Sequence, residues 1–121
     1  MDRKDIILSK YEINFGKVHQ EAKLEDYITI SDVNEIDYWY VNCGCTKVKI
    51  NGNKIQIDFD VAHSIGGAIL KAGQTKTADR FIEIWFDKDQ PQYVANDVTK
   101  KRENNNLKRS HRIPINFLAR A

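Results

Sequence analysis

Residues 46–59, TKVKINGNKIQIDF, decide the fold class of this chain. Asn51-Gly52 is typical of the two-residue turn of a β-hairpin, because both central positions of that turn favour residues that tolerate positive φ angles. With this turn, Ile50 is predicted to lie opposite Asn53, so that apolar and polar residues separate onto opposite faces. The apolar face is expected to contain Val48, Ile50, Ile55, Ile57 and Phe59.

The same alternation of apolar and polar residues recurs along the chain and predicts further strands. The segments are Ile7 to Phe15, Ile28 to Ile30, Ile36 to Tyr40, Ile82 to Phe86 and Ile113 to Phe117. In the third segment, Ile36, Tyr38 and Tyr40 are expected to share one face. Pro114 lacks an amide donor, which favours an edge strand for the last segment. Seven to nine short strands without a helical period predict an all-β, antiparallel β-sandwich.

Length and composition favour one soluble domain over residues 1–121. Hydrophobic residues make up 41% of the chain and charged residues 30%, as in ordinary globular proteins. The polar N-terminus leads into only three apolar residues, Ile6 to Leu8, too few for a signal-peptide core or a membrane span. We therefore expect no export signal, no membrane partner and a cytoplasmic site of synthesis.

Three short motifs carry a family resemblance. They are Phe15-Gly16-Lys17-Val18, Cys43-Gly44-Cys45-Thr46 and Lys71-Ala72-Gly73-Gln74-Thr75. Their order resembles a bacterial domain family of unknown function that is marked by an FGxV strand and a CGCT loop, over roughly residues 8–118. The resemblance implies an immunoglobulin-like sandwich, similar to hydin-type and major-sperm-protein-type domains. The structural motif residues would be Phe15, Gly16, Cys43, Gly44, Cys45 and Thr46.

The resemblance also implies a role in interaction or assembly and no catalytic activity. Members of the family are often exported, whereas this chain shows no export signal. A compact, signal-free version resembles the sandwich modules that tailed phages use in their particles. The predicted function is therefore a non-enzymatic structural or protein-interaction module, as an auxiliary capsid-associated or tail-associated component of a tailed-phage virion. The alternative is a bacterial CGCT-type domain that binds a protein partner in a larger assembly, and a third class is a small nucleic-acid-binding protein.

Cys43 and Cys45 are the only cysteines. A structural zinc site needs four nitrogen or sulfur ligands, and a CxC pair supplies half of them. A disulfide between the two would close a small, strained ring, and cytosolic thiols are normally reduced. We therefore predict two free thiols that are partly or wholly buried at the end of the sandwich, with no metal and no cofactor.

Other residue pairs that suggest chemistry have simpler explanations. Adjacent residues such as His63-Ser64 rarely present their side chains to each other, and no third group is evident to position a nucleophile. Asp58 with Asp60, and Asp87 with Asp89, are typical of solvated strand faces and turns, because calcium sites need a loop with many oxygen ligands. The sequence therefore predicts no catalytic residue.

A basic segment is the strongest functional candidate in the sequence. Residues 98–112 contain six Lys or Arg and one Glu, a net charge of +5, and since the whole chain carries +2, the remainder carries −3. We predict a long loop or hairpin arm over about residues 87–112 that binds an acidic protein surface, such as a capsid or tail protein. Nucleic acid is a weaker expectation, because the segment lacks aromatic residues for base stacking. The partner-binding residues would be Lys100, Lys101, Arg102, Lys108, Arg109 and Arg112.

Overall fold

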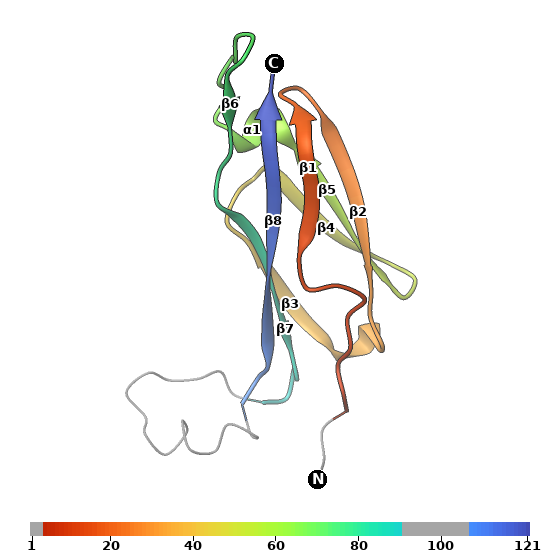
Figure 1. Cartoon of the computed structure of the whole chain (residues 1–121). Helices are drawn as coiled ribbons and strands as arrows, with labels where there is room; N and C mark the ends of the chain where they lie inside the picture. Colours follow the sequence, from red (N-terminus) through yellow and green to blue (C-terminus); the bar gives the residue numbers. More distant parts are fainter. Residues whose placement is uncertain (1–3, 91–106) are drawn as a thin grey trace, which may run out of the picture.

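Over residues 4–90 and 107–121, which are the residues that the structure describes, the computed structural model is a mostly-β sandwich with eight strands in two sheets (Figure 1). The strands are β1 (Ile13–His19), β2 (Lys23–Thr29), β3 (Ile36–Val41), β4 (Thr46–Asn51), β5 (Lys54–Asp60), β6 (Thr75–Lys76), β7 (Arg80–Phe86) and β8 (Ser110–Arg120). Two single helical turns, η1 (Val33–Glu35) and α1 (Val61–Ser64), connect strands at opposite ends of the sandwich (Figure 1).

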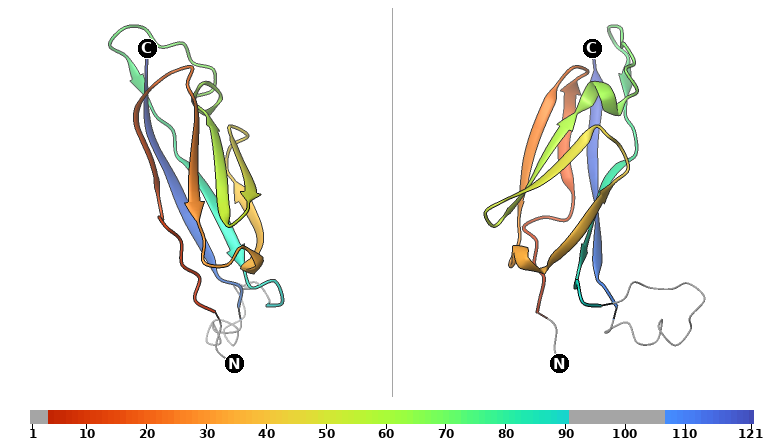
Figure 2. Two further views of the ribbon diagram at one scale, coloured as in Figure 1. Left: turned by 90° about the vertical axis from the view of Figure 1, so that its right-hand side faces the viewer. Right: turned by 180° about the vertical axis from the view of Figure 1, so that it is seen from behind.

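The strand order confirms the predicted β-sandwich. One sheet has the order β1-β8-β7-β3, with β6 also paired to β8, and the other has the order β2-β5-β4. These sheets correspond to the C-F-G and B-E-D strands of immunoglobulin domains, and the two layers are seen edge-on in Figure 2. One difference from the predicted antiparallel arrangement is that β1 pairs with β8 in parallel.

The core lies between the inner faces of the two sheets. The predicted alternation of β7 and β8 is confirmed, because their apolar residues at every second position are buried. These residues are Ile82, Ile84, Phe86, Ile113, Ile115 and Phe117. Phe59 of β5 lies across from them, with its ring centroid 5.7 Å from that of Phe15 and 5.0 Å from that of Phe117. This aromatic contact joins the two layers.

The predicted hairpin is present, but its register is shifted by two residues. Ile50 lies opposite Ile55, and Asn51 lies opposite Lys54, so the turn residues are Gly52 and Asn53. Gly52 has a φ of 64°, and Asn53 is not among the residues with positive φ, which is the pattern of a type II′ turn. The apolar face is nevertheless as predicted, because a shift of two residues preserves the alternation.

The predicted first strand divides into two parts with opposite phase. Leu8 forms an isolated bridge with Ile30 and is buried, whereas Ile7 is 62% exposed. The regular strand β1 then begins only at Ile13, after a bend at Tyr11 and Glu12. The prediction of one continuous strand from Ile7 to Phe15 is therefore wrong, because the bend changes which side of the chain faces inward and leaves Ile7 and Tyr11 exposed.

Two details of the five-stranded sheet also differ from expectation. In β3 the register shifts between Ile36 and Tyr38, so that Ile36 lies opposite buried Phe86 and is itself buried, while Tyr38 faces outward. In β8, Pro114 is not on an edge strand, because β8 lies between β1 and β7. The ladder with β1 starts at Ile115, one residue after the proline, which explains how a central strand accommodates it.

The Phe15-Gly16 pair of the sequence motif forms a β-bulge in β1. Asn14 pairs with Asn116 and Gly16 with Phe117, so Phe15 is the extra residue of the ladder. Gly16 has a φ of 70°, a left-handed conformation in which a side chain costs free energy. The glycine therefore allows the bulge that places the Phe15 ring against Phe59.

Replacement of this glycine should destabilise the fold through its backbone alone. We expect Gly16→Ala to lower the free energy of unfolding by about 1–2 kcal/mol and Gly16→Asn by less, because Asn tolerates the left-handed region. No heavy atom lies within 4 Å of the position that a Cβ would take, so steric contact would not contribute. Urea denaturation would measure the difference, with Lys17→Ala as the neighbouring surface control. Equal stability of Gly16→Ala and the wild type would contradict this account.

His111 should make stability depend on pH. Its ring lies edge-on to Tyr11 and Phe86, at centroid distances of 5.1 and 5.9 Å. Burial, and secondarily the nearby Arg109 charge, lower the pKa of His111 below its usual value. The unfolded chain then binds the proton more readily, so stability should fall as the pH decreases through the ordinary histidine range and below it. We expect His111→Phe to reduce this slope between pH 7.5 and 5.5 in chemical denaturation, and an unchanged slope would refute the assignment.

Candidate partner-binding surface

Four aromatic side chains gather on the outer face of the five-stranded sheet. This aromatic face consists of Tyr38 and Tyr40 from β3 and Phe81 and Trp85 from β7. Tyr38 and Trp85 are stacked, with ring centroids 5.9 Å apart and an interplanar angle of 10°, and the centroids of Tyr40 and Phe81 are 6.2 Å apart. The residues gather because cross-strand neighbours on one face of a sheet lie side by side.

Two charged residues complete the aromatic face. Arg112 of β8 places its Cζ 4.2 Å from the Phe81 ring centroid and donates a 2.9 Å bond from Nη2 to Glu83. The indole nitrogen of Trp85 donates to the other carboxylate oxygen of Glu83 at 2.8 Å. These contacts hold Arg112 and Trp85 in position, and the Glu83 carboxylate balances the charge of the arginine. Trp, Tyr and Arg are the residue types that dominate binding energies at protein interfaces.

The aromatic face borders an edge strand of the described sheet. β3 is the last strand of its sheet in the described chain. In an antiparallel pair, alternate residues direct both their N–H and C=O groups away from the neighbouring strand. These groups of β3 therefore point away from β7. Trp39, which lies on the inner side of the strand, is 38% exposed, and Tyr40 on the outer side is 54% exposed.

The other edges carry features that discourage pairing with another strand. β1 has the Gly16 bulge, and β4 carries Lys47 and Lys49 on its polar face. β2 has an inward-facing charge, because Asp26 lies opposite Ile57 and binds Lys10 at 2.6 Å. Among these sheet edges in the described chain, the β3 edge combines exposed aromatic residues with one acidic group, Asp37, that is itself paired with a lysine. β3 therefore differs from the other edge strands in its exposed aromatic residues and its low charge.

The basic arm is only partly described by the structure. Lys100, Lys101 and Arg102 lie outside the described residues. Lys108, Arg109 and Arg112 are described, and the structure places each of them beside a carboxylate. The partner-binding role of the arm remains a prediction, and these three cations contribute less free positive charge than the sequence suggests.

The ion pair between Arg109 and Asp87 closes the base of the arm. Arg109 binds Asp87 through two side-chain nitrogens at 2.8 and 3.0 Å, and its backbone N–H donates to the same carboxylate at 3.1 Å. These bonds raise the pKa of Arg109 above its usual value. Lys108 reaches across to Asp37 of β3 at 2.6 Å and also donates to the Lys88 carbonyl at 2.7 Å. The Arg109–Asp87 pair thereby joins the two described ends of the arm, and Lys108 fixes this base to β3.

The CGCT motif forms a tight turn that connects β3 to β4. Cys43 and Cys45 are joined by a disulfide, so the prediction of two free thiols is wrong. The physical reason is that the turn, closed by a bond from the Thr46 N–H to the Cys43 carbonyl, brings the two Cα atoms to 5.1 Å, within the range of disulfides. The predicted burial is confirmed, since Cys45 is 3% exposed and Cys43 is half-buried.

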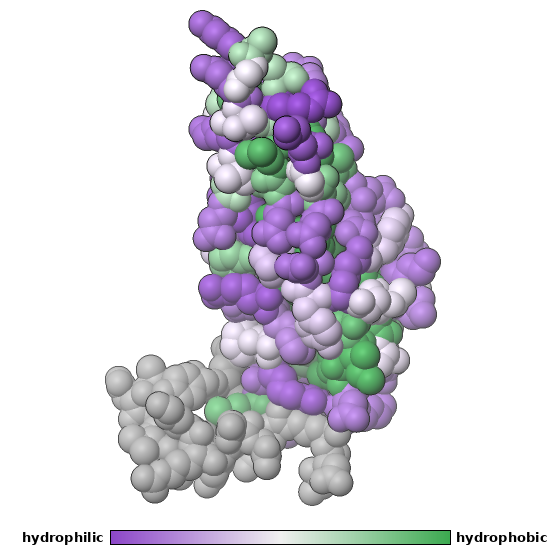
Figure 3. All heavy atoms as spheres, viewed as in Figure 1, coloured by the Kyte–Doolittle hydropathy of each residue, from purple (hydrophilic) through white to green (hydrophobic). Residues whose placement is uncertain are grey.

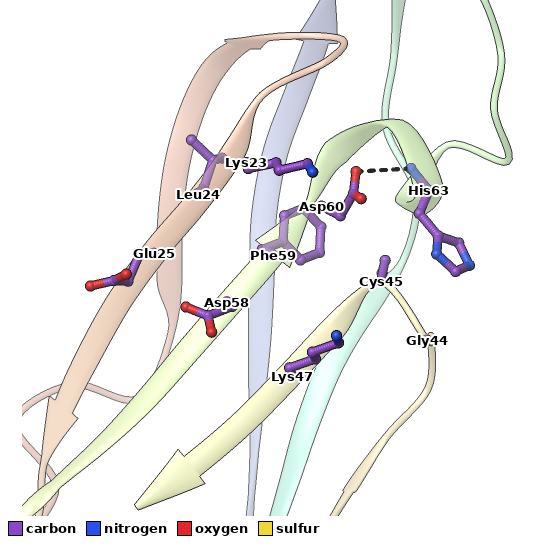
Figure 4. Close-up of a pocket in the computed structure, with 10 residues that line it drawn as sticks. All are labelled: Lys23, Leu24, Glu25, Gly44, Cys45, Lys47, Asp58, Phe59, Asp60 and His63. Carbon is purple, nitrogen blue, oxygen red and sulfur yellow. Dashed lines mark hydrogen bonds between the residues drawn. The ribbon is translucent and has the colours of Figure 1, made fainter. Parts of the chain in front are cut away.

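A shallow depression of about 610 Å³ lies beside this turn, on the outer side of the three-stranded sheet (Figure 4). Side chains of both charges line it, including Lys23, Lys47, Asp58 and Asp60. Asp60 caps α1 by accepting a 3.3 Å bond from the His63 backbone N–H, which is drawn as a dashed line in Figure 4. The mixture of charges gives the depression no clear preference for an anionic or a cationic ligand.

The structure separates the adjacent pair His63 and Ser64. His63 is exposed on α1, whereas Ser64 is fully buried and its hydroxyl accepts a 3.3 Å bond from Arg80. Arg80 also donates to the Ser64 carbonyl at 2.6 Å. In the described part of the chain, no group of three or more His, Cys, Asp or Glu side chains is arranged to hold a metal ion. No helix within the same residues has the length and apolar character needed to cross a membrane.

Hydrophilic side chains predominate on the side of the molecule that Figure 3 shows, and the apolar ones form small patches. No extensive aliphatic surface is visible on that side of the described residues. Sequence reasoning missed this site, although the signal was present: Phe81 and Trp85 alternate with the buried residues of β7. Comparison of the chain with protein-family models, curated proteins and solved structures gives no match.

The Arg109–Asp87 pair should contribute measurably to stability. The Asp87 side chain is only 7% exposed, so removal of Arg109 would leave a nearly buried carboxylate with less compensation. We expect Arg109→Met to lower the free energy of unfolding by about 1–3 kcal/mol, because the guanidinium is itself one-third exposed. Arg112→Met, which removes a more exposed arginine, should cost less than about 1 kcal/mol. Thermal and urea denaturation would compare them, and equal losses would refute this ranking.

Proposed function

We propose that this protein is a non-enzymatic interaction module that binds a partner protein through the β3 edge and the aromatic face. The observation that carries the proposal is the contrast between β3 and the other edge strands. An edge with exposed Trp39 and Tyr40 and little charge provides backbone groups for a further strand and aromatic side chains to anchor it.

An extended segment of a partner protein fits this site better than a second copy of the chain. Tyr38, Trp39 and Tyr40 are 38%, 38% and 54% exposed. Aromatic residues bury about 150–250 Å² each, so these three offer about 300 Å² at a β3-to-β3 contact. Stable interfaces bury about 800 Å² per partner. An extended segment can cross from the edge onto the aromatic face and cover both.

We further propose that the partner is a component of a tailed-phage particle, with this protein as an auxiliary capsid-associated or tail-associated subunit. The support for this part is that the chain, as a compact version of the CGCT-type sandwich, resembles the sandwich modules that tailed phages use in their particles. The alternative is a bacterial CGCT-type domain that uses the same edge in a larger assembly. In either case the basic arm, Lys100 to Arg102 above all, would add attraction to an acidic partner surface.

Nucleic acid is the less favoured partner. The structure does bring aromatic rings beside Arg112, which the basic segment alone lacks. However, Arg112 is paired with Glu83 at 2.9 Å, so the aromatic face carries no excess of positive charge for phosphates. Displacement by heparin would distinguish the two partners, since a protein interface with apolar contacts should persist in its presence.

The proposal predicts that a single edge residue controls association. Particles purified from a culture that makes the protein would be analysed by mass spectrometry and electron microscopy for this chain, and then tested for rebinding by co-sedimentation. We expect Tyr40→Ser to weaken binding about tenfold, the loss of roughly one interface anchor. Tyr27→Ser is the matched control, because Tyr27 is an exposed tyrosine on the opposite sheet.

The two parts of the proposal fail in different ways. Absence of the chain from the particles would refute the virion role. Equal binding by Tyr40→Ser and Tyr27→Ser would refute the β3 edge as the interface and return attention to the basic arm.

A further inference from the structure

The two cysteines of the Cys43–Cys45 disulfide differ in their exposure to solvent. Cys43 is half-buried, whereas Cys45 is 3% exposed. Thiol–disulfide exchange starts when a thiolate attacks the sulfur that it can reach, and the other sulfur leaves. The difference in exposure therefore selects Cys43 as the point of attack and Cys45 as the leaving group.

Each sulfur has a polar group that can stabilise its thiolate. The Cys45 backbone N–H donates to Cys43 Sγ at 3.1 Å. The Thr46 hydroxyl lies 3.5 Å from Cys45 Sγ and is able to donate to it. Hydrogen bonds to the charged form lower the pKa of an acid, and a stabilised thiolate both leaves and attacks more readily at neutral pH.

The turn also lies at the surface, where another protein can reach it. Gly44 and Cys45 form part of the wall of the depression in Figure 4, together with Lys47 and His63. A Cβ on Gly44 would lie 3.5 Å from His63 Cε1, so the imidazole sits directly beside the turn. Lys47, on the same wall of the depression, places a cation on the side of the turn, and a nearby cation favours thiolates.

We propose that Cys43 and Cys45 are a redox-active pair that exchanges with a dithiol of another protein. In the forward direction, a thiolate of the partner bonds to Cys43 Sγ, and the Cys43–Cys45 bond breaks to give a Cys45 thiolate. The second thiol of the partner, once deprotonated, attacks its own sulfur in the mixed disulfide and releases the Cys43 thiolate. The two thiolates of this protein take up the two protons lost by the partner. The partner dithiol is oxidised and the Cys43–Cys45 disulfide is reduced, with two electrons transferred.

This activity is independent of partner binding at β3, because the turn lies beyond the end of that strand. It also explains why both cysteines and Thr46 occur together in the CGCT motif. The alternative is a disulfide that only stabilises the turn, and the two differ in how readily the folded protein exchanges.

The first experiment uses the wild-type protein, folded and without denaturant. It would be equilibrated in mixtures of reduced and oxidised glutathione, alkylated and weighed by mass spectrometry. We expect the Cys43–Cys45 disulfide to open within the range of redox potentials that glutathione buffers cover. The oxidised fraction of the protein should fall from about nine-tenths to about one-tenth as the square of the reduced glutathione concentration, divided by the concentration of oxidised glutathione, rises about a hundredfold. A disulfide that stays closed throughout, or opens only on denaturation, would overturn the proposal. Thiols that stay reduced throughout would overturn it as well.

The second experiment tests the assigned roles. Cys45→Ser should form a mixed disulfide with glutathione at Cys43, detected as one added glutathione per chain. Cys43→Ser should react at least about tenfold more slowly with oxidised glutathione, because the remaining thiol is buried. Circular dichroism would confirm that both variants are folded. Equal rates for the two variants would contradict the attack on Cys43, and the wild-type measurement stands even if a variant fails to fold.

Discussion

The contact of Phe59 with Phe15 and Phe117 is the interaction on which the rest of the structure depends, because it joins residues of both sheets at the centre of the core. Phe15 reaches this position through the Gly16 bulge. Phe59 belongs to β5, and the next residue, Asp60, is fixed at both its side chain and its backbone. Its carboxylate caps α1, and its N–H donates to the Cys45 carbonyl at 2.9 Å. The two sequence motifs are thus tied to one aromatic cluster, which gives them a structural meaning that does not depend on function.

Alternation of apolar residues predicted most of the strands correctly, because burial on one face imposes a period of two. It failed where the backbone departs from a regular strand. The bend after Lys10 and the irregularity at Asp37 each reverse which residues face inward, and no local signal distinguishes such a position from a regular one. The turn at Gly52 was misplaced by one residue for a similar reason, since asparagine and glycine are acceptable at both of its central positions. Parallel pairing of β1 with β8 is a long-range property that turn chemistry cannot reveal.

The candidate site was harder to predict than the fold. Charge clustering draws attention to the basic segment, yet the partners of Lys108 and Arg109 come from distant parts of the chain, Asp37 and Asp87. The aromatic face likewise depends on the order of strands, which places β3 beside β7 at the end of the described sheet. Composition shows neither relation. The disulfide was rejected on ring size, whereas the geometry of the turn accommodates it.

The pairing of β1 with β8 sets when this protein can fold during synthesis. Asn14 and Asn116 share a hydrogen bond across 102 positions of sequence, and β8 also carries the ladders to β6 and β7. Folds dominated by such distant contacts close slowly, on a scale of about milliseconds to seconds. On the ribosome, the five-stranded sheet lacks its central strand until Ser110–Arg120 has left the exit tunnel. Until then the apolar inner faces of β1, β3 and β7 lack the strand that connects them, and exposed apolar strands of this kind are prone to aggregate.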